Sequence, residues 1–278
     1  MKRKKQLLCS LVILIILPAL TSAAVDETAW NTVLKEQYFS GKKIQEGAKI
    51  IDIEAPYRAE DPALVPIKIT SKIAQTQSKY IKKLMLFVDK NPYPFVAEFD
   101  FTPKTGKADL ALRIRVNTYS YVRAIAEMND GKLYMVKKFV KASGGCSAPI
   151  GADMDAAMKR LGKMKFRLDE EIKTGQPTLA QLLISHPNVT GMQMNQVTRF
   201  ISKSNFVEKV KITYNGEAII TAKTDIAVSA DPNFRFYFIP DKPGILKAEI
   251  SDISCESPTS RAVCKKGKRY SKTLKVEP

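Results

Sequence analysis

Short runs of strand-forming residues, separated by turn signals, recur along almost the entire chain. Over residues 110–116, apolar side chains at the even positions alternate with Ala or Arg at the odd positions, as in a strand with one buried face. Turn signals such as Asn215-Gly216 suit tight hairpins, because both residues accept a positive φ. Many short strands of this kind are typical of a β-sandwich. The predicted strands cover residues 48–53, 64–70, 81–89, 95–101, 108–116, 121–128, 133–140, 165–172, 179–185, 207–214, 218–222, 234–239, 245–250 and 270–276.

A change of composition near the middle divides these strands into two groups. Residues 153–161 are good helix formers with acidic residues first and basic residues last, which suits the helix dipole. Residues 26–39 predict another short helix, with apolar residues near helical spacing. We therefore expect an all-β protein with one sandwich over residues 24–146, a linker with a short helix over 147–163, and a second sandwich over 164–278.

The first 23 residues resemble a secretory signal peptide. A basic start, Met-Lys-Arg-Lys-Lys, precedes an apolar stretch over residues 7–17 and small residues over 21–24. This order is typical of export signals, and the apolar stretch is shorter than the roughly 20 residues that span a membrane. We expect cleavage near residue 24, a periplasmic protein and no stable membrane insertion afterwards. The alternative is an uncleaved anchor.

The predicted export also restricts the partners of this basic chain. The formal charge is +17, and cleavage would remove four basic residues and leave +13 (17 − 4). Nucleic acid is the usual partner of such a charge, but export argues against it, and we expect none. Small anions, acidic proteins or an anionic membrane surface are the remaining partners, and solubility alone is the simpler explanation.

Export changes the interpretation of the cysteines, because disulfides persist in an oxidising compartment. Cleavage would remove Cys9 and leave Cys146, Cys255 and Cys264. Cys255 and Cys264 flank a turn-like segment between two predicted strands, so we expect them to pair and contribute about 2–3 kcal/mol to stability. We predict no metal there, because further ligands are lacking nearby and the chain has a single histidine, His186.

Cys146 is then a free thiol, flanked by Gly144, Gly145 and small residues. Buried structural cysteines usually lie in apolar runs, so we expect this thiol to be exposed and available for covalent chemistry. The three preceding lysines could favour the thiolate and attract sulfur oxyanions, or they could be the solvated edge of a strand. These lysines are Lys137, Lys138 and Lys141. An exposed thiol could also link two chains through a Cys146–Cys146 disulfide.

Ordered motifs in both halves resemble the SoxY–SoxZ carrier of the sulfur-oxidation system, with both proteins fused in one chain. The first half carries Ile53-Glu-Ala-Pro56, Phe87-Val-Asp-Lys-Asn-Pro92, Arg113-Ile-Arg115 and Gly144-Gly-Cys146. The second half carries Leu183-Ile-Ser-His-Pro187, Thr190-Gly191, Tyr214-Asn-Gly216, Val228-Ser-Ala-Asp-Pro232 and Phe234-Arg-Phe-Tyr-Phe238. The resemblance covers nearly the whole mature chain and implies two immunoglobulin-like domains and a carrier rather than an enzyme.

The resemblance also implies a role for Cys146. In SoxY a Gly-Gly-Cys-Gly-Gly arm at the chain end carries the sulfur substrate covalently. Here Gly144, Gly145 and Cys146 match the start of that arm, and we call these three residues the arm. Ser147-Ala-Pro-Ile150 replaces the closing glycines, and the arm is internal. The chain looks most like fused carriers associated with quinoprotein dehydrogenases in methylotrophic bacteria.

The leading hypothesis is therefore a periplasmic carrier with a covalent sulfur adduct on Cys146 and no other cofactor. Its partners would be periplasmic redox enzymes or c-type cytochromes, including a quinoprotein dehydrogenase. This hypothesis requires an accessible sulfur atom, and a sulfur packed inside the sandwich would contradict it. The alternative is an accessory docking module for such a dehydrogenase or its cytochrome, without covalent cargo. A thiol oxidoreductase is disfavoured, because Cys255 and Cys264 are not spaced as a Cys-x-x-Cys pair.

A copper site is a further alternative for the second half. His186, Met192 and Met194 could be grouped as soft ligands for Cu(I). Methionine more often serves as flexible packing, and a histidine before a proline at a strand end more often has a structural hydrogen bond. We therefore favour a structural role for His186.

Overall fold

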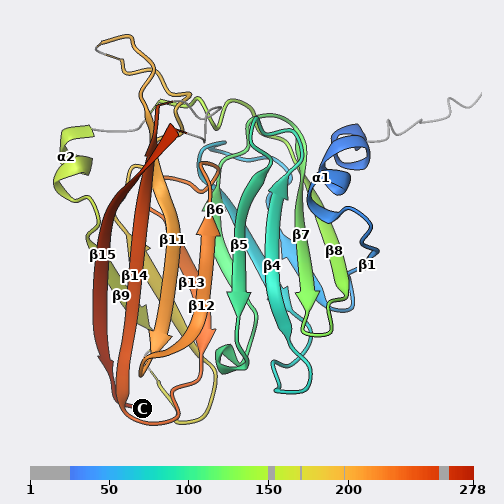
Figure 1. Ribbon diagram of the computed structural model, residues 1–278, viewed down its shortest axis with the longest axis vertical. Helices are drawn as coiled ribbons and strands as arrows, with labels where there is room; N and C mark the ends of the chain where they lie inside the picture. The colour runs from blue at the N-terminus through green and yellow to red at the C-terminus, as the bar shows by residue number, and fades with distance from the viewer. Residues whose placement is uncertain (1–25, 150–153, 170, 197, 257–262) are drawn as a thin grey trace, which may run out of the picture.

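The computed structural model describes residues 26–149, 154–169, 171–196, 198–256 and 263–278. The predicted signal peptide lies outside this part of the chain. Within the described ranges, no helix has the length and apolar character needed to cross a membrane. The fold is all-β, as predicted, with two sheets stacked face to face (Figure 1).

The larger sheet has nine strands and the smaller sheet six. In spatial order the larger sheet contains β1 (Ile44–Glu46), β8 (Leu133–Val140), β7 (Ser120–Met128), β4 (Ile81–Val88), β5 (Phe95–Phe101), β12 (Glu217–Thr224), β11 (Ser204–Tyr214), β14 (Gly244–Cys255) and β15 (Cys264–Val276). The smaller sheet contains β2 (Ile51–Glu54), β3 (Val65–Ser71), β6 (Leu110–Ile114), β13 (Asn233–Phe238), β10 (Thr178–Ile184) and β9 (Met164–Leu168). The helical turns are η1 (Trp30–Leu34), α1 (Lys35–Phe39), η2 (Pro103–Thr105) and α2 (Met154–Lys159).

Both sheets run without interruption from the first half of the chain into the second. In the larger sheet β5 pairs with β12, with Phe101 opposite Ile220. In the smaller sheet β6 pairs with β13, with Ala111 opposite Arg235. These pairings satisfy the backbone groups of strands that would otherwise be open edges. The two immunoglobulin-like halves are therefore joined edge to edge along a seam that the sequence pattern did not reveal.

The core follows the predicted alternation and crosses the seam. In β3, Val65, Ile67 and Ile69 are buried while the intervening Pro66 and Lys68 are exposed. One apolar cluster contains inward-facing residues of both halves. A second example of contact across the seam is the edge-to-face pair of Phe99 on β5 and Phe234 on β13, with ring centroids 5.8 Å apart. The halves thus share a core as well as sheets.

The predicted N-terminal helix is present as η1 and α1, and it covers the outer face of the larger sheet near β4, β7 and β8 (Figure 1). Trp30, Leu34 and Phe39 pack there against Phe87 and other sheet residues. Beneath them Arg123 is fully buried, and its guanidinium lies 4.5 Å from the Trp30 ring. The helix therefore closes a second, smaller core.

The middle helix α2 falls within the segment predicted as a linker and lies on the opposite side of the molecule from α1 (Figure 1). None of the residues of α2 is buried in the described part of the structure. One strand was missed: β1 pairs in parallel with β8, with Ile44 opposite Leu133. A three-residue strand is too short to show a periodic pattern.

Candidate functional site

The arm folds back onto the molecule directly after β8. The Gly144 amide donates to the Asn117 carbonyl over 2.8 Å, and the Gly145 amide donates to the Val116 carbonyl over 3.2 Å. The Ser147 amide donates to the Gly144 carbonyl over 3.2 Å and closes a turn around Cys146. The arm is therefore docked on the segment that follows β6.

The glycines of the arm allow this close docking. Gly144 has a φ of 81°, a conformation that side chains with a Cβ rarely adopt. A Cβ added at Gly145 would lie 2.1 Å from the Pro62 carbonyl oxygen and 2.6 Å from that of Val116. Since both obstacles are backbone atoms, no other residue fits at Gly145 without moving the arm.

The second half of the chain holds the arm from the other side. The Thr190 hydroxyl donates to the Cys146 carbonyl over 2.7 Å. The Gln193 side-chain amide donates to the Ala148 carbonyl over 2.9 Å, and its carbonyl oxygen accepts from the Thr190 amide over 2.9 Å. The Cys146 amide donates to the Asn117 side chain over 3.2 Å. The arm thus contacts both halves, and its hydrogen bond from Thr190 is buried.

The Cys146 thiol is buried, with 2% of the residue exposed, and it forms no disulfide. Burial raises the pKa of this thiol from an ordinary 9.0 to about 11, against the opposing effect of Arg115. The expectation of an exposed thiol is therefore wrong for the docked arm. It considered only the small residues flanking Cys146. The arm is drawn inward because Thr190 donates a hydrogen bond to Cys146, Asn117 accepts one from it, and Gln193 donates one to the adjoining Ala148.

Arg115 is a buried cation beside this thiol. Its Nη1 donates to the Gly145 carbonyl over 3.2 Å, and its Nη2 donates to the Asn188 carbonyl over 3.3 Å. No carboxylate of the described residues lies within 4.0 Å of it. Burial lowers the pKa of Arg115, and Cys146 counteracts this; a guanidinium nevertheless stays charged near neutral pH. Strand alternation assigns Arg115 to the exposed face, so the sequence named it only within the Arg113-Ile-Arg115 motif and gave no sign of its burial near Cys146.

The three predicted anion-attracting lysines lie elsewhere on the first half. Lys137 is ion-paired with Glu27 over 2.5 Å. Lys138 is exposed on β8. Lys141 Nζ lies 4.8 Å from the ring centroid of Tyr57 and 6.0 Å from that of Tyr119. The charges that act on the Cys146 pKa are instead those of Arg115 and Asp225.

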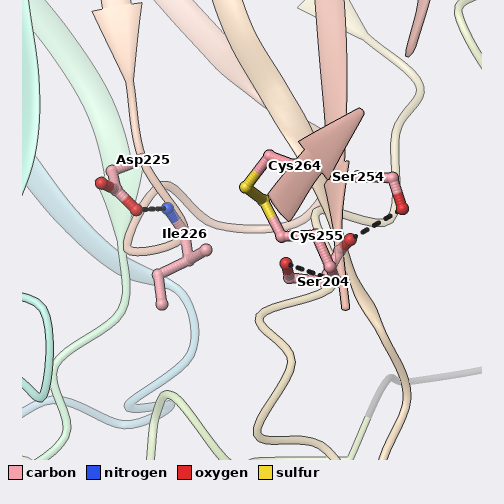
Figure 2. The surroundings of a disulfide bond; sticks show 6 residues. All are labelled: Ser204, Asp225, Ile226, Ser254, Cys255 and Cys264. Atoms are coloured by element: carbon pink, nitrogen blue, oxygen red, sulfur yellow. Dashed lines mark hydrogen bonds between the residues drawn. A yellow bond between two sulfur atoms is a disulfide. The ribbon is translucent and has the colours of Figure 1, made fainter. Parts of the chain in front are cut away.

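The predicted disulfide is present and lies at the ends of β14 and β15 (Figure 2). Cys255 and Cys264 are directly opposite each other in the pairing of these strands. The Ser204 hydroxyl donates to the Cys255 carbonyl over 3.3 Å, which ties the bridge to β11. This disulfide uses both other described cysteines and leaves Cys146 free.

His186 has the structural environment that we favoured. It is 1% exposed, its Nδ1 accepts from the Asn188 amide over 3.1 Å, and its Nε2 lies 3.5 Å from Asp252 Oδ2. Met194 is 43% exposed. In the described part of the chain, no group of three or more His, Cys, Asp or Glu is placed to hold a metal ion.

Comparison with known proteins finds a family match in each half. Residues 35–146 match the model described as sulfur oxidation protein SoxY, and residues 166–263 match that described as sulphur oxidation protein SoxZ. The sulfur carrier protein SoxY of Chlorobium limicola f thiosulfatophilum is 29% identical, with a TM-score of 0.33, over 39% of this chain and 87% of that chain. The superoxide reductase (neelaredoxin) of Ignicoccus hospitalis, in its E23A form, is 16% identical with a TM-score of 0.31, over 34% and 79% respectively. No curated protein matches the chain.

Proposed function

Because this chain belongs to the SoxYZ-like sulfur-oxidation carriers, with SoxY and SoxZ domains fused, we propose that Cys146 binds a sulfur intermediate covalently in the periplasm. The SoxY match ends at Cys146, which is the free cysteine of the described residues. That coincidence carries the proposal. The protein is a carrier and not an enzyme, so the chemistry at Cys146 is completed by partner proteins.

Loading requires a thiolate and an oxidant. One balanced step joins the Cys146 sulfur to the terminal sulfur of thiosulfate, releases the thiol proton, and passes two electrons to a c-type cytochrome partner. The product is an S-thiosulfonate with a new sulfur–sulfur bond. Since the thiolate is the nucleophile, a pKa of about 11 makes the docked thiol nearly inert at neutral pH.

The arm must therefore undock before loading. Undocking breaks the hydrogen bond that Thr190 donates to Cys146 and the one that the Cys146 amide donates to Asn117. It returns the thiol to water, where its pKa falls toward the ordinary value. With Ala142 still held, four extended residue steps to Cys146 move the sulfur by at most about 14 Å. Docking would then protect the empty carrier, and undocking would present the thiol to a partner's pocket.

Tetrathionate tests this chemistry without a partner protein. A thiolate displaces thiosulfate from tetrathionate and keeps one thiosulfonate group, which intact-protein mass spectrometry detects. We expect slow labelling of the native protein and none with Cys146→Ser. Thr190→Val, which removes the hydroxyl donor at nearly constant volume, should label about tenfold faster because a buried hydrogen bond contributes about 1–1.5 kcal/mol. An unlabelled but folded Thr190→Val protein would argue against covalent cargo.

The buried thiol also favours a second candidate, an accessory docking module for a quinoprotein dehydrogenase or its cytochrome. Its contact surface would include the exposed Tyr57 and Tyr119 around Lys141, near the start of the arm. Host-pathway activity separates the two functions. Covalent carriage predicts that Cys146→Ser abolishes activity, whereas docking alone predicts unchanged activity with Cys146→Ser and a loss with Tyr57→Ala.

A further inference from the structure

A cavity of about 620 Å³ opens on the smaller sheet and lies outside the Cys146 site. Its lining comes from β2, β3 and β6 of the first half and from β13 of the second half. It therefore straddles the seam where β6 pairs with β13. Ligand cavities typically measure about 300–1,000 Å³, so the size suits a small molecule.

The pairing register of the strands explains why the cavity forms there. Lys68, Ala111 and Arg235 lie in one row across β3, β6 and β13. Their neighbours along the strands, such as Leu112 and Phe236, point into the core, so this row faces outward. Neighbouring strands are about 4.8 Å apart, so the backbones of Lys68 and Arg235 lie about 10 Å apart, with the methyl group of Ala111 between the two long side chains. Ala111 thus forms the floor.

Two arginines that line the cavity come from different halves of the chain. Arg113 on β6 is diagonal to Arg235 on β13, and diagonal neighbours are about 7–8 Å apart. Within the described residues, no carboxylate lies within 4.0 Å of either guanidinium. Arg113 Nη2 donates to the Asp231 carbonyl over 3.2 Å, which fixes its position.

The remaining charges of the cavity nearly cancel each other. Lys68 is ion-paired with Glu54 over 2.8 Å, and both line the cavity. The two arginines therefore leave a local excess of positive charge at the seam. Guanidinium groups suit carboxylate, sulfonate and sulfate oxygens, because their N–H groups match two oxygens at once.

Apolar side chains also line the cavity. Ala55, Pro56 and Pro66 lie on the side of β2 and β3, and Pro66 is directly opposite Arg113 in the strand pairing. We propose that this cavity binds a small organic anion, with its carboxylate or sulfonate head on Arg113 and Arg235 and its apolar body over Ala111 and the prolines. The head site exists only when the two halves are joined. This site is independent of the covalent cargo proposed for Cys146.

Calorimetric titration of the full chain with benzenesulfonate tests the site. We expect saturable binding that weakens at least about tenfold in Arg113→Gln/Arg235→Gln, since both substitutions remove charged hydrogen bonds to the head group. The matched control Lys165→Gln/Arg167→Gln removes two cations from β9 of the same sheet. It should leave the affinity within about twofold. Equal weakening by both double variants would show nonspecific charge attraction and overturn the proposal.

Two further experiments test the shape of the site. Ala111→Met fills the floor without changing charge, and a folded Ala111→Met protein should bind at least about tenfold more weakly. Sulfate contains only the anionic head group and benzyl alcohol contains the apolar ring without the anion, so each should bind more weakly than benzenesulfonate. Absence of benzenesulfonate binding to the native protein, undiminished binding to Ala111→Met, or equal affinity for sulfate would refute the inference.

Discussion

Replacing Gly145 by alanine should release the arm and expose Cys146. The new Cβ would lie 2.1 Å from the Pro62 carbonyl oxygen and 2.6 Å from the Val116 carbonyl oxygen, and neither backbone atom can rotate away. The docked position is therefore lost. With it go the hydrogen bonds that the Gly145 amide and carbonyl form with Val116 and Arg115.

The size of the effect follows from the thiol pKa. Docking raises the pKa of Cys146 from 9.0 to about 11, a difference of about 2. At pH 7.5 undocking therefore increases the thiolate fraction about 100-fold, since each pKa unit is a factor of ten. Cys146 is only 2% exposed in the docked arm, so exposing its thiol adds to this gain. We expect alkylation at least about 100-fold faster in Gly145→Ala.

Iodoacetamide labelling followed by intact-protein mass spectrometry measures this rate. Gly131→Ala is a control away from the arm: no described atom lies within 4 Å of an added Cβ, although Gly131 has a φ of 81° that side chains with a Cβ rarely adopt. It adds backbone strain but no collision, in a turn away from the arm, and should label like the native protein. Equal rates for a folded Gly145→Ala and the native protein would refute the docking argument, and so would native labelling as fast as that of an unfolded chain.

Three other outcomes follow from the same structure. Because the docked Cys146 has a raised pKa, its stabilising effect should be fully present below about pH 9 and decline by about 2–3 kcal/mol toward pH 11. The difference in unfolding free energy between the native protein and Cys146→Ala, measured as a function of pH, should show this decline. A difference that does not change with pH would contradict the prediction. Phe99→Ala, which opens the shared core, should lower the unfolding free energy by about 3–5 kcal/mol, whereas Phe200→Ala, at a residue 77% exposed, should change it little; similar losses would argue against a core shared across the seam. Replacing Cys255 and Cys264 by serine should cost about 2–3 kcal/mol in urea unfolding, and an unchanged midpoint and slope would show that the bridge adds no stability.

Local patterns predicted the strands well where one face is buried. The run 133–140 coincides with β8, and the run 95–101 coincides with β5. In contrast, the run predicted over 270–276 is the end of a longer strand, β15, which begins at Cys264. Residues 265–269 are exposed and mostly charged, so they show no alternation, and only their pairing with β14 makes them a strand.

The candidate site divides in the same way. Removal of Cys9 by the predicted cleavage leaves three cysteines, and the hairpin spacing was then enough to pair Cys255 with Cys264 and to leave Cys146 free. The spacing argument is local, so the sequence alone could supply it. The burial of Cys146 could not be predicted from local sequence patterns. It depends on Thr190, which is far away in the sequence, and on Arg115, which lies on the face that alternation assigns to solvent.

The amino-acid sequence by itself determined the all-β class, the resemblance of the two halves to SoxY and SoxZ, the disulfide and the identity of the free thiol. Each of these depends on residue type and short-range spacing. Only the tertiary structure decided that both sheets continue across the seam, that the arm is docked, and that Arg113 and Arg235 share one cavity. The physical reason is that side-chain alternation specifies which face of a strand is buried, whereas backbone pairing between distant segments decides which strands lie beside it.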